Sequence, residues 1–421
     1  MNKVFVLDDR KRPLMPCRPA RARRLLAAGK AAVYRRMPFT IILSYDVKPA
    51  NQEIEFKVDP GSKTTGVALI GKFDRGNELL WGANLSHRGH TIKDAMESRR
   101  SLRRGRRNRK TRYRAKPEGW LPPSLQSRVD NVSSFLKKLC FRTPISECHV
   151  ETVRFDMQKL VNPEISGVDY QQGELFGYEI REYLLEKWRR TCAYCDKKDV
   201  PLEIEHIHPK SKGGSDRVSN LTLACHCCNQ AKGNLPIEQF VKDNTRLLRI
   251  LAQAKAPLKD AAAVNATRYA IGHAIRAFGL PTAFWSGGRT KCNRTQQGYP
   301  KDHFIDAACV GESGASVMIN ADIKPLLIKA TGRGTRQTVR TDKFGFPRNK
   351  AGRVKRVHGF STGDLVRLTQ PNGKYAGTYV ARLAGIRADG RFDIATAMGK
   401  VTANFKHFSL IQRGDGYAYA H

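Results

Sequence analysis

Four of the ten cysteines in this chain of 421 residues form two CxxC pairs. Cys192 and Cys195 make the first pair, and Cys225 and Cys228 make the second. Paired thiolates at this spacing favour tetrahedral zinc, and a structural zinc site uses all four coordination positions. The stretch between the pairs is longer than the loop of a simple zinc ribbon, so we expect it to carry a second functional site. Cys227 is the spare thiol and is expected to pack as a small side chain.

A Glu-His pair lies in the stretch between the two cysteine pairs, which reads LEIEHIHPKSKGGSDRVSN. His206 can take a proton from a water beside a phosphodiester. Glu205 and Asn229 can hold a cation on the leaving oxygen through their oxygen atoms. Asn220 and His208 are expected to support the connecting loop. A surface Glu-His pair is common by itself, but this order beside two CxxC pairs is a much rarer coincidence.

A second group of reactive side chains is dispersed along the sequence. It consists of Asp59 in FKVDPGSKTTG, Glu151 in HVETVRF, and His303 with Asp306 in KDHFIDAACVG. Each is weak evidence by itself, because an aspartate that ends a strand is commonly a cap. Two-metal phosphodiester hydrolysis, however, needs several carboxylates from separate elements around cations about 4 Å apart. We therefore expect these four residues to converge in the fold.

Predicted strands and helices would position the residues of the dispersed group. The first 52 residues predict a small α+β unit. Its parts are the strand VFVLD, a turn at PLMP (residues 13 to 16), the helix ARARRLLAAGKA and the return strand AAVYRRMPFTIIL, interrupted at Pro38. Residues 53 to 86 predict three strands separated by Gly-rich turns, an antiparallel meander whose first strand ends at Asp59. ECHVETVRFD, at residues 147 to 156, predicts a further strand.

Helices are predicted on both sides of the cysteine-rich region. EIREYLLEKWRR precedes it, and PIEQFVKDNTRLLRILAQAKA and APLKDAAAVNATRYAIGHAIRAFG follow it, with a break at Pro257. His303 and Asp306 are expected on adjacent turns of one short helix. The C-terminal hundred residues change character, since GDLVRL, GTYVARLAGI, GRFDIAT and VTANFKHFSLIQR predict short strands between turns such as PNG and ADG. These strands favour a small β-barrel.

The charge balance restricts the partners. The chain has 75 Lys and Arg against 38 Asp and Glu, a formal charge of +37 that favours nucleic acid. A membrane-surface protein is the alternative, but the sequence has no apolar run of about 18 residues and no amphipathic lipid anchor. The N-terminal MNKVFVLDDRKRPLMP lacks the apolar core of a signal peptide. A cytoplasmic protein with access to the nucleoid and with reduced thiols is therefore expected.

The basic residues concentrate in SRRSLRRGRRNRKTRYR at residues 98 to 114, which has almost no apolar face. A solvated basic helix or tail is the ordinary explanation of such a run. This run is internal, so we expect phosphates to surround it, since Arg pairs bidentately with phosphate and stacks on bases. The expected nucleic-acid contacts are Arg99, Arg100, Arg103, Arg104, Arg106, Arg107, Arg109, Lys110, Arg112 and Arg114.

The order of Glu-His and two asparagines resembles the HNH nuclease motif of the ββα-metal fold. In that family the general base matches His206 and the metal ligands match Glu205 and Asn229, although many HNH proteins have Asp where Glu205 stands. The dispersed group resembles the RuvC nuclease, an RNase H-like fold, with its sequence cut into three pieces. The Arg-rich run lies in the first gap and the HNH motif in the second. This order, with PLMP and the terminal strands, resembles the transposon-encoded IscB family of RNA-guided DNA endonucleases.

The resemblance implies an α/β multidomain protein. Its RNase H-like core is split in three and carries an inserted ββα-metal domain with a zinc clip, between a small α+β N-terminal domain and a C-terminal β-barrel. The implied segments are 1–52 (PLMP domain), 53–92 (RuvC-I), 93–117 (Arg-rich bridge helix), 118–186 (RuvC-II), 187–240 (HNH), 241–325 (RuvC-III) and 326–421 (interaction with RNA and the target-adjacent motif).

The resemblance also implies an activity, cofactors and partners. A noncoding guide RNA would program binding to double-stranded DNA beside a short adjacent motif. The HNH site would cut the guide-paired strand with one Mg²⁺, and the RuvC site would cut the displaced strand with two. Zinc would be structural, and the protein would act as a monomeric ribonucleoprotein. The implied catalytic residues are Asp59, Glu151, Glu205, His206, Asn229, His303 and Asp306.

Two other functions stay open. A guide-free endonuclease of the homing or junction-resolving kind could use both motifs, but it would not need the internal Arg-rich run. A basic protein that binds RNA or the ribosome would need only the charge and the zinc. That second alternative leaves Asp59, Glu151 and Asp306 without a role.

Overall fold

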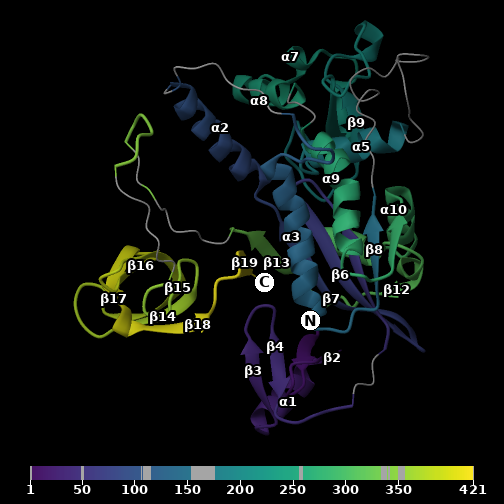
Figure 1. The fold of residues 1–421 in the computed structure, drawn as a ribbon. Coiled ribbons are helices and arrows are strands. Elements are labelled where there is room, and N and C mark those ends of the chain that lie inside the picture. Colours follow the sequence, from purple (N-terminus) through teal and green to yellow (C-terminus); the bar gives the residue numbers. More distant parts are fainter. Residues whose placement is uncertain are drawn as a thin grey trace. The chain divides into compact units, whose positions relative to one another are not determined.

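The computed structural model describes residues 2–48, 52–105, 107, 115–152, 176–255, 259–332, 339, 342–348 and 356–420. The chain divides into two compact units (Figure 1). Met1–Thr152 and Tyr269–His421 form the first, and Val153–Arg268 forms the second. The second unit is thus an insertion in the sequence of the first. Helices and strands occur in both units, which confirms the expected mixed α/β, multidomain class.

The first unit begins with a four-stranded sheet in the order β2-β1-β4-β3. β1 pairs parallel with β4, and the other two pairs are antiparallel. The PLMP stretch forms strand β2 rather than the expected turn, because Leu14 is buried and pairs with Val6 on β1. The expected return strand is two strands that flank Pro38. The bounds are β1 Val4–Leu7, β2 Pro13–Cys17, α1 Pro19–Ala27, β3 Ala31–Arg35 and β4 Thr40–Leu43.

The central sheet of the first unit has the order β11-β8-β5-β6-β7-β13-β19, with β12 also paired to β7. β5, β6 and β7 form the predicted antiparallel meander. β8 and β11 extend the β5 edge in parallel, β13 is parallel to β7, and β19 is antiparallel to β13. The bounds are β5 Ile54–Asp59, β6 Thr64–Phe73, β7 Gly76–Ser86, β8 Glu147–Glu151, β11 Thr282–Trp285, β12 Val317–Met318, β13 Leu326–Ala330 and β19 Tyr417–Ala420.

Helices cover the two faces of this sheet differently. On one face, Val132 and Phe135 of α3 share a buried core with Phe56 of β5. Phe304 and Ala307 of α11 belong to a second core with β6 and β7. Strand side chains alternate between faces, so the odd-numbered residues of β5 lie opposite α3. The helices of this unit are α2 Gly89–Gly105, α3 Pro123–Cys140, the later part of α9 Lys259–Arg276, α10 Gly287–Gln296, α11 His303–Ala308 and the 3₁₀ turn Ser313–Ser316.

The second unit is built around a two-stranded hairpin with short helices. Its core includes Tyr194, Leu223 and Ile250. The long helix predicted after the cysteines is two helices, α7 and α8, because the Asp243 side chain accepts the backbone N–H of Thr245 and so starts a new helix. The bounds are α5 Phe176–Lys187, β9 Leu202–His206, the 3₁₀ turn Lys210–Lys212, β10 Leu221–Cys225, α6 His226–Lys232, α7 Ile237–Phe240 and α8 Asn244–Ala254.

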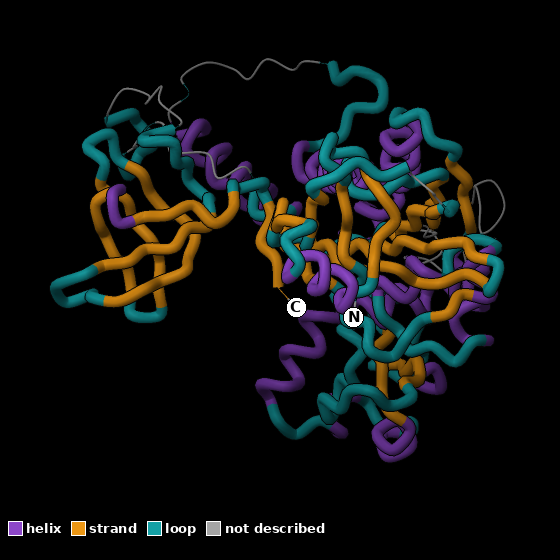
Figure 2. Tube along the Cα trace, turned by 90° about the horizontal axis from the view of Figure 1, so that it is seen from below, coloured by secondary structure: helices purple, strands orange, loops and turns teal. Residues whose placement is uncertain are grey.

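The C-terminal strands form an antiparallel sheet in the order β17-β16-β15-β14-β18. Figure 2 draws these strands in orange, curving around a core that contains Leu368, Phe392 and Phe408. The described pairings run from β17 to β18 as an open series. The bounds are β14 Leu365–Gln370, β15 Gly377–Ile386, β16 Arg391–Thr396, β17 Gly399–Asn404, the 3₁₀ turn Phe405–His407 and β18 Phe408–Gln412. Among the described helices, none combines the length and apolarity needed to cross a bilayer.

Candidate active sites

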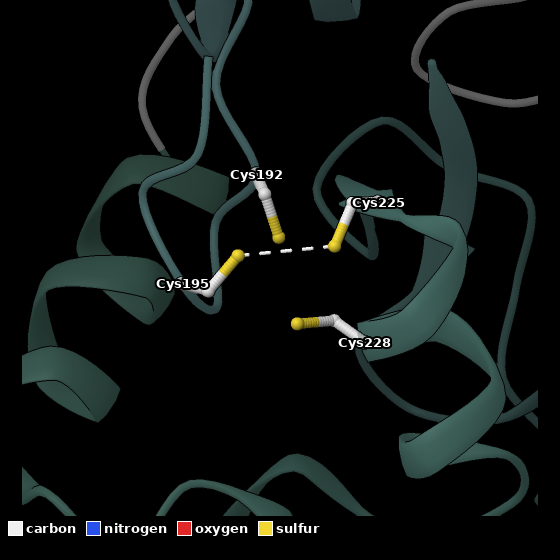
Figure 3. A group of neighbouring side chains, drawn as sticks. All are labelled: Cys192, Cys195, Cys225 and Cys228. Carbon is white, nitrogen blue, oxygen red and sulfur yellow. Dashed lines mark hydrogen bonds between the residues drawn. The ribbon is translucent and has the colours of Figure 1, made fainter. Parts of the chain in front are cut away.

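The four CxxC thiols lie in one cluster. Figure 3 shows Cys192, Cys195, Cys225 and Cys228 pointing toward a common centre, and their Sγ atoms all lie within 4.8 Å of one another. Cys195 Sγ is 3.8 Å from Cys225 Sγ. Two sulfur ligands at a tetrahedral Zn–S distance of about 2.3 Å are separated by about 3.8 Å. The cluster therefore fits a structural zinc that leaves no coordination position for a substrate.

The thiols of the cluster differ in acidity. The backbone N–H of Cys228 lowers the pKa of Cys225 to about 7, whereas burial raises the pKa of Cys192. A bound divalent cation would hold all four as thiolates. Cys227 lies outside this cluster and is exposed, so its expected packing as a buried side chain is wrong.

The hairpin and α6 hold the other reactive side chains of the inserted unit. β9 pairs with β10 from Leu202, opposite Cys225, to His206, opposite Leu221, and α6 follows β10 directly. Glu203 and Glu205 are two residues apart on β9, so they share one face. Side chains of α6 contact both glutamates, which identifies this face as the one turned toward the helix.

Glu205 is enclosed by two protein donors. Lys232 Nζ lies 2.7 Å from Glu205 Oε1 and also donates to the backbone carbonyl of His206 at 2.8 Å. Tyr194 Oη donates to the other carboxylate oxygen. Lys232 is 1% exposed and Glu205 is 5% exposed, so this is a buried ion pair. Sequence reasoning missed Lys232, although its spacing of three residues from Asn229 on α6 is a helical one.

Asn229 contacts a different glutamate from the one expected. Its Nδ2 donates to Glu203 Oε2 at 2.6 Å, and His226 Nδ1 lies 2.9 Å from Glu203 Oε1. The hydrogen bond from Asn229, followed by that from His226, lowers the pKa of Glu203. The signal that could have identified Glu203 is the ExE repeat in LEIEH, which puts two carboxylates on one face of a strand.

His206 has an acidic partner that was not predicted. Its Nε2 lies 2.8 Å from Asp216 Oδ1, and Lys210 Nζ lies 2.8 Å from Asp216 Oδ2. The hydrogen bonds from Lys210 and His206 lower the pKa of Asp216, so this carboxylate is ionised. An ionised acceptor at Nε2 keeps the proton on that nitrogen and leaves Nδ1 as the basic atom of a neutral imidazole.

The loop between β9 and β10 is supported as predicted. Asn220 accepts the backbone N–H of His208 at 2.9 Å, and its amide donates to the carbonyls of His208 and Ser215 at 3.0 and 2.8 Å. His208 Nε2 lies 2.9 Å from the carbonyl oxygen of Lys212. These bonds close the loop that brings Asp216 to His206.

In the first unit, strand register brings Asp59 and Glu151 together. β5 and β8 are parallel and pair Val58 with Val150, so the next residues on the two strands lie at the same level. Both are the last residues of their strands. Asp59 lies on the face of the sheet opposite α3, since Val58 packs in the core with that helix. Two of the four residues expected to converge thus lie on neighbouring strand ends.

The short helix α11 carries His303 and Asp306 to the same strand ends. Gly66, the partner of Asp59 in the sheet, makes this approach possible, because a Cβ at Gly66 would stand 1.8 Å from the carbonyl oxygen of His303. His303 Cε1 lies 3.8 Å from the Cβ position of Gly61, in the turn after Asp59. The absence of a side chain at Gly66 thus sets the distance between the helix and the sheet.

The three carboxylates influence one another strongly. Burial raises the pKa of Glu151 well above its ordinary value, and the negative charges of Asp59 and Asp306 raise it further. Asp306 Oδ1 lies 2.9 Å from Arg294 Nε, and its Oδ2 lies 3.3 Å from Lys301 Nζ. Among the described residues, the trio does not reach the mutual 4.8 Å spacing of the four thiols. Divalent cations would offset both the burial and the neighbouring negative charges that raise the pKa of Glu151.

A neighbouring acidic cluster on the same face fits a metal poorly. Glu55, Glu147 and His149 have metal-like spacing. Lys72 already contacts both carboxylates, at 3.0 and 2.5 Å. Trp285 Nε1 donates to His149 Nδ1 at 2.9 Å, so the proton of the neutral imidazole is on Nε2, the nitrogen that would have to bind the metal. We therefore regard this cluster as a buried charge network.

The Arg-rich run begins in α2, which has no buried residue among those described. Arg99, Arg100, Arg103 and Arg104 are exposed on this helix, and Arg107 is exposed just after it. Their charge is available to phosphate. The other expected contacts lie outside the described residues: Arg106, Arg109, Lys110, Arg112 and Arg114.

Two stretches of the chain match known protein families. Residues 4–173 match the family described as RRXRR protein, and residues 192–235 match the family described as HNH endonuclease. No protein of curated function matches the chain. The inserted unit therefore carries an HNH endonuclease domain, and hydrolysis of phosphodiester bonds is the chemistry of that domain.

Solved structures give only distant similarities. One is the Type II-C Cas9 enzyme from Actinomyces naeslundii, at 16% identity and TM-score 0.18, covering 48% of this chain and 32% of that one. Another is Streptococcus thermophilus Cas9 in complex with the AGAA PAM, at 13% identity and TM-score 0.22, covering 62% of this chain and 32% of that one. The chain spans about a third of the length of these proteins.

Proposed function

We propose that this protein is an RNA-guided endonuclease for double-stranded DNA, of the kind found in the IscB family. The main support for this proposal is that Asp59, Glu151 and Asp306 converge from three separate stretches of sequence. The HNH domain is inserted between the second and the third of these stretches. An endonuclease with one active site would need only one of these two groups. Two sites on separate units suit the cleavage of two strands.

In the HNH site, Nδ1 of His206 would take the proton of the attacking water. Asp216 would keep the ring in the tautomer and orientation that this step requires. A Mg²⁺ near Asn229, when bound, would stabilise negative charge on the leaving oxygen. The four-cysteine cluster would hold zinc as a structural element, because it fixes the loop of Tyr194 against the hairpin.

In the dispersed site, Asp59, Glu151 and Asp306 would hold two Mg²⁺, which supply a nucleophilic hydroxide and stabilise the leaving oxygen. His303, beside the turn that follows Asp59, would position the scissile phosphate or move a proton. We propose that these parts form an RNase H-like core. Its meander β5 to β7, with β8 and β11 added in parallel, is assembled from the segments 53–92, 118–186 and 241–325, and 187–240 is the HNH segment.

Nucleic acid would be held mainly outside the two sites. The exposed arginines of α2, within the bridge segment 93–117, would contact the guide RNA and its heteroduplex. We propose that segments 1–52 and 326–421 bind the RNA and the duplex beside the target, the latter as a small barrel. The ribonucleoprotein would contain one copy of the protein.

Strand-specific cleavage tests this proposal. The protein is purified with its nucleic acid, which is sequenced, and each strand of a matching duplex carries its own label. His206→Ala should slow cutting of the guide-paired strand by about a hundredfold or more and spare the other strand, and Asp59→Ala should do the reverse. Both cuts should need Mg²⁺ and stop with EDTA.

The copurified nucleic acid separates the alternatives. A single discrete RNA supports guidance, whereas cleavage without RNA would indicate a guide-free endonuclease. Bulk ribosomal RNA without any cleavage would indicate a basic RNA-binding protein. If either substitution stops both cuts, the assignment of one site to each strand is wrong.

A further inference from the structure

The face of the hairpin turned toward α6 has two levels of contact. At the level of Glu203, the helix presents His226 and Asn229, which are three residues apart. At the level of Glu205, it presents Lys232, another three residues along. The two glutamates are about 7 Å apart along the strand, since each residue adds about 3.3 Å. One helix face thus gives one carboxylate an ammonium partner and the other an amide and an imidazole.

Glu205 already has a cationic partner, the ammonium group of Lys232. The Lys232 ammonium is buried, and its donors go to Glu205 Oε1 and to the carbonyl of His206. Tyr194 holds the remaining oxygen of Glu205 from within the first CxxC loop. A divalent ion at Glu205 would have to stand beside this buried ammonium or displace it, which would leave it only the carbonyl of His206 among its described partners. Both alternatives are costly, because a buried charge that loses its partner is strongly destabilising.

Glu203, at the other level, is hydrogen-bonded by Asn229 and His226. Among its described contacts no lysine or arginine donates a hydrogen bond to it. The charge of Arg181, whose guanidinium donates to the carbonyl of Leu202, acts on this carboxylate without such a bond. The Glu203 side chain is 40% exposed, so water and a metal can reach it. Asn229 now donates its Nδ2 to Glu203, and a half-turn of the amide would replace this donor by the carbonyl oxygen Oδ1. Carboxylate and amide oxygens are the ligands that Mg²⁺ prefers, with water completing its shell. His226 flanks the same carboxylate at 2.9 Å.

We infer that Glu203, together with Asn229, holds the cation of the HNH domain, and that Glu205 instead anchors α6 to the first CxxC loop through Lys232 and Tyr194. This inference rests on the proposed nuclease function of the domain. It departs from the expectation that the glutamate next to the catalytic histidine is the metal ligand. The glutamate two residues earlier takes that role because Lys232 neutralises the expected one.

Direct titration with Mn²⁺, followed by electron paramagnetic resonance, tests the assignment without any cleavage reaction. The full-length protein with its zinc retained is used, in a background with Asp59→Ala and Glu151→Ala, which removes two ligands of the dispersed site. Each variant is compared with this background, because Asp8, Asp9 and Asp46 also have metal-like spacing and can bind Mn²⁺. Glu203→Gln should weaken Mn²⁺ binding at least about tenfold. Glu205→Gln should leave Mn²⁺ binding within about twofold but lower the melting temperature, since it leaves Lys232 without its charged partner. Glu238→Gln, an exposed change on α7, is the control for both.

A double variant guards against a folding failure. Glu205→Gln with Lys232→Met removes both charges, so it should recover much of the lost melting temperature and still bind Mn²⁺. If this double variant loses Mn²⁺ while Glu203→Gln keeps it, the cation belongs at Glu205. Equal losses in both, or no Mn²⁺ binding by the background protein, also overturn the inference. Normal Mn²⁺ results without cleavage of either strand would instead refute the proposed function alone.

Discussion

The two candidate active sites solve the same chemical problem at different scales. The HNH residues occupy one short stretch of sequence, on a hairpin and a seven-residue helix. The dispersed carboxylates come from Asp59, Glu151 and Asp306, and the buried core of a large sheet positions them. A smaller unit buries less apolar surface, and zinc in the four-cysteine cluster, as we propose, would add to its stability. The large unit obtains the same rigidity from packing and strand register.

The two sites also differ in charge balance. In the HNH domain, Glu205 faces Lys232, and Asp216 faces His206 and Lys210. In the dispersed site, the charges of two aspartates act on a buried glutamate and raise its pKa. The first site is therefore close to neutral before any catalytic metal binds. In the second site Arg294 and Lys301 contact Asp306, but burial and the charges of the two aspartates favour the neutral form of Glu151. A carboxylate that would bind cations thus lies where its ionised form is disfavoured, so the stability and the function of this site oppose each other.

Loss of the clip gives the largest expected difference between the sites. Cys225→Ser should remove zinc, unfold the HNH domain and reduce cutting of the guide-paired strand to the detection limit, while nicking of the displaced strand continues. Zinc content measured by mass spectrometry and strand-specific cleavage follow the two effects. Cys227→Ser, two residues away and exposed, is the matched control and should change neither. A Cys225→Ser protein with full zinc content would contradict the structural role.

Glu151→Gln tests the opposition between stability and function in the dispersed site. It should slow cutting of the displaced strand about a hundredfold or more, yet raise the melting temperature of the metal-free protein. Because the pKa of Glu151 is raised on folding, the native protein loses stability as pH rises from the ordinary value of 4.5 toward the raised one. Glutamine has no proton to lose, so the gain should be larger at pH 8 than at pH 5.

Calorimetry at the two pH values, with EDTA present, measures this gain. The melting temperature of a unit of this size shifts by about 1.5 °C for each kcal/mol. Glu118→Gln, an exposed change in the same unit, serves as the control. A melting temperature that falls, or a gain of equal size at both pH values, would mean that Glu151 is not held against repulsion.

Asp216→Ala should have a smaller effect that is confined to the HNH site. Loss of the partner of Nε2 leaves the His206 ring free to turn, so we expect kcat for the guide-paired strand to fall roughly tenfold with KM unchanged. Asp216→Asn, which can still accept the ring N–H, should recover part of this loss. An equal fall on both strands, or no recovery with asparagine, would contradict a positioning role for this carboxylate.

The arginines of α2 should affect the two sites equally. Replacing four of them by alanine should lower guide-RNA affinity and both cuts together, and reduce the salt slope of binding by up to about 0.9 for each duplex phosphate that the helix no longer neutralises. The changes are made at Arg99, Arg100, Arg103 and Arg104. A control replaces four exposed lysines of the inserted unit: Lys197, Lys198, Lys242 and Lys255. An unchanged slope in a binding titration would show that the helix faces away from the nucleic acid.

Sequence patterns predicted the secondary structure best in segments where the local pattern of residues determines the element. The meander β5 to β7 follows from alternating residues and Gly-rich turns, and α1 from its apolar spacing. The helix α3 drew no prediction, although Val129, Val132, Phe135 and Leu136 have helical spacing and form much of the core. Residues 13 to 16 have turn residues, but β1 provides a partner strand that overrides the local preference.

The residues with chemical roles were easier to predict than their partners. Asp59 could be selected because it ends a predicted strand, and Glu151 because another predicted strand carries it. The ammonium of Lys232 and the carboxylate of Asp216 could not, because their contacts depend on how a hairpin, a helix and a loop meet in space. Glu203 was overlooked for the same reason, since which of two glutamates faces Asn229 depends on the register between β9 and α6.

The last strand of the central sheet can pair only after the rest of the chain has been synthesised. β19 pairs with β13, yet the whole C-terminal sheet lies between them in the sequence. While a ribosome makes that sheet, for roughly ten seconds at ordinary rates, the backbone groups of β13 that later bond to β19 have no strand partner. During this interval the nascent central sheet keeps an open edge, where a chaperone or another chain could bind before β19 arrives.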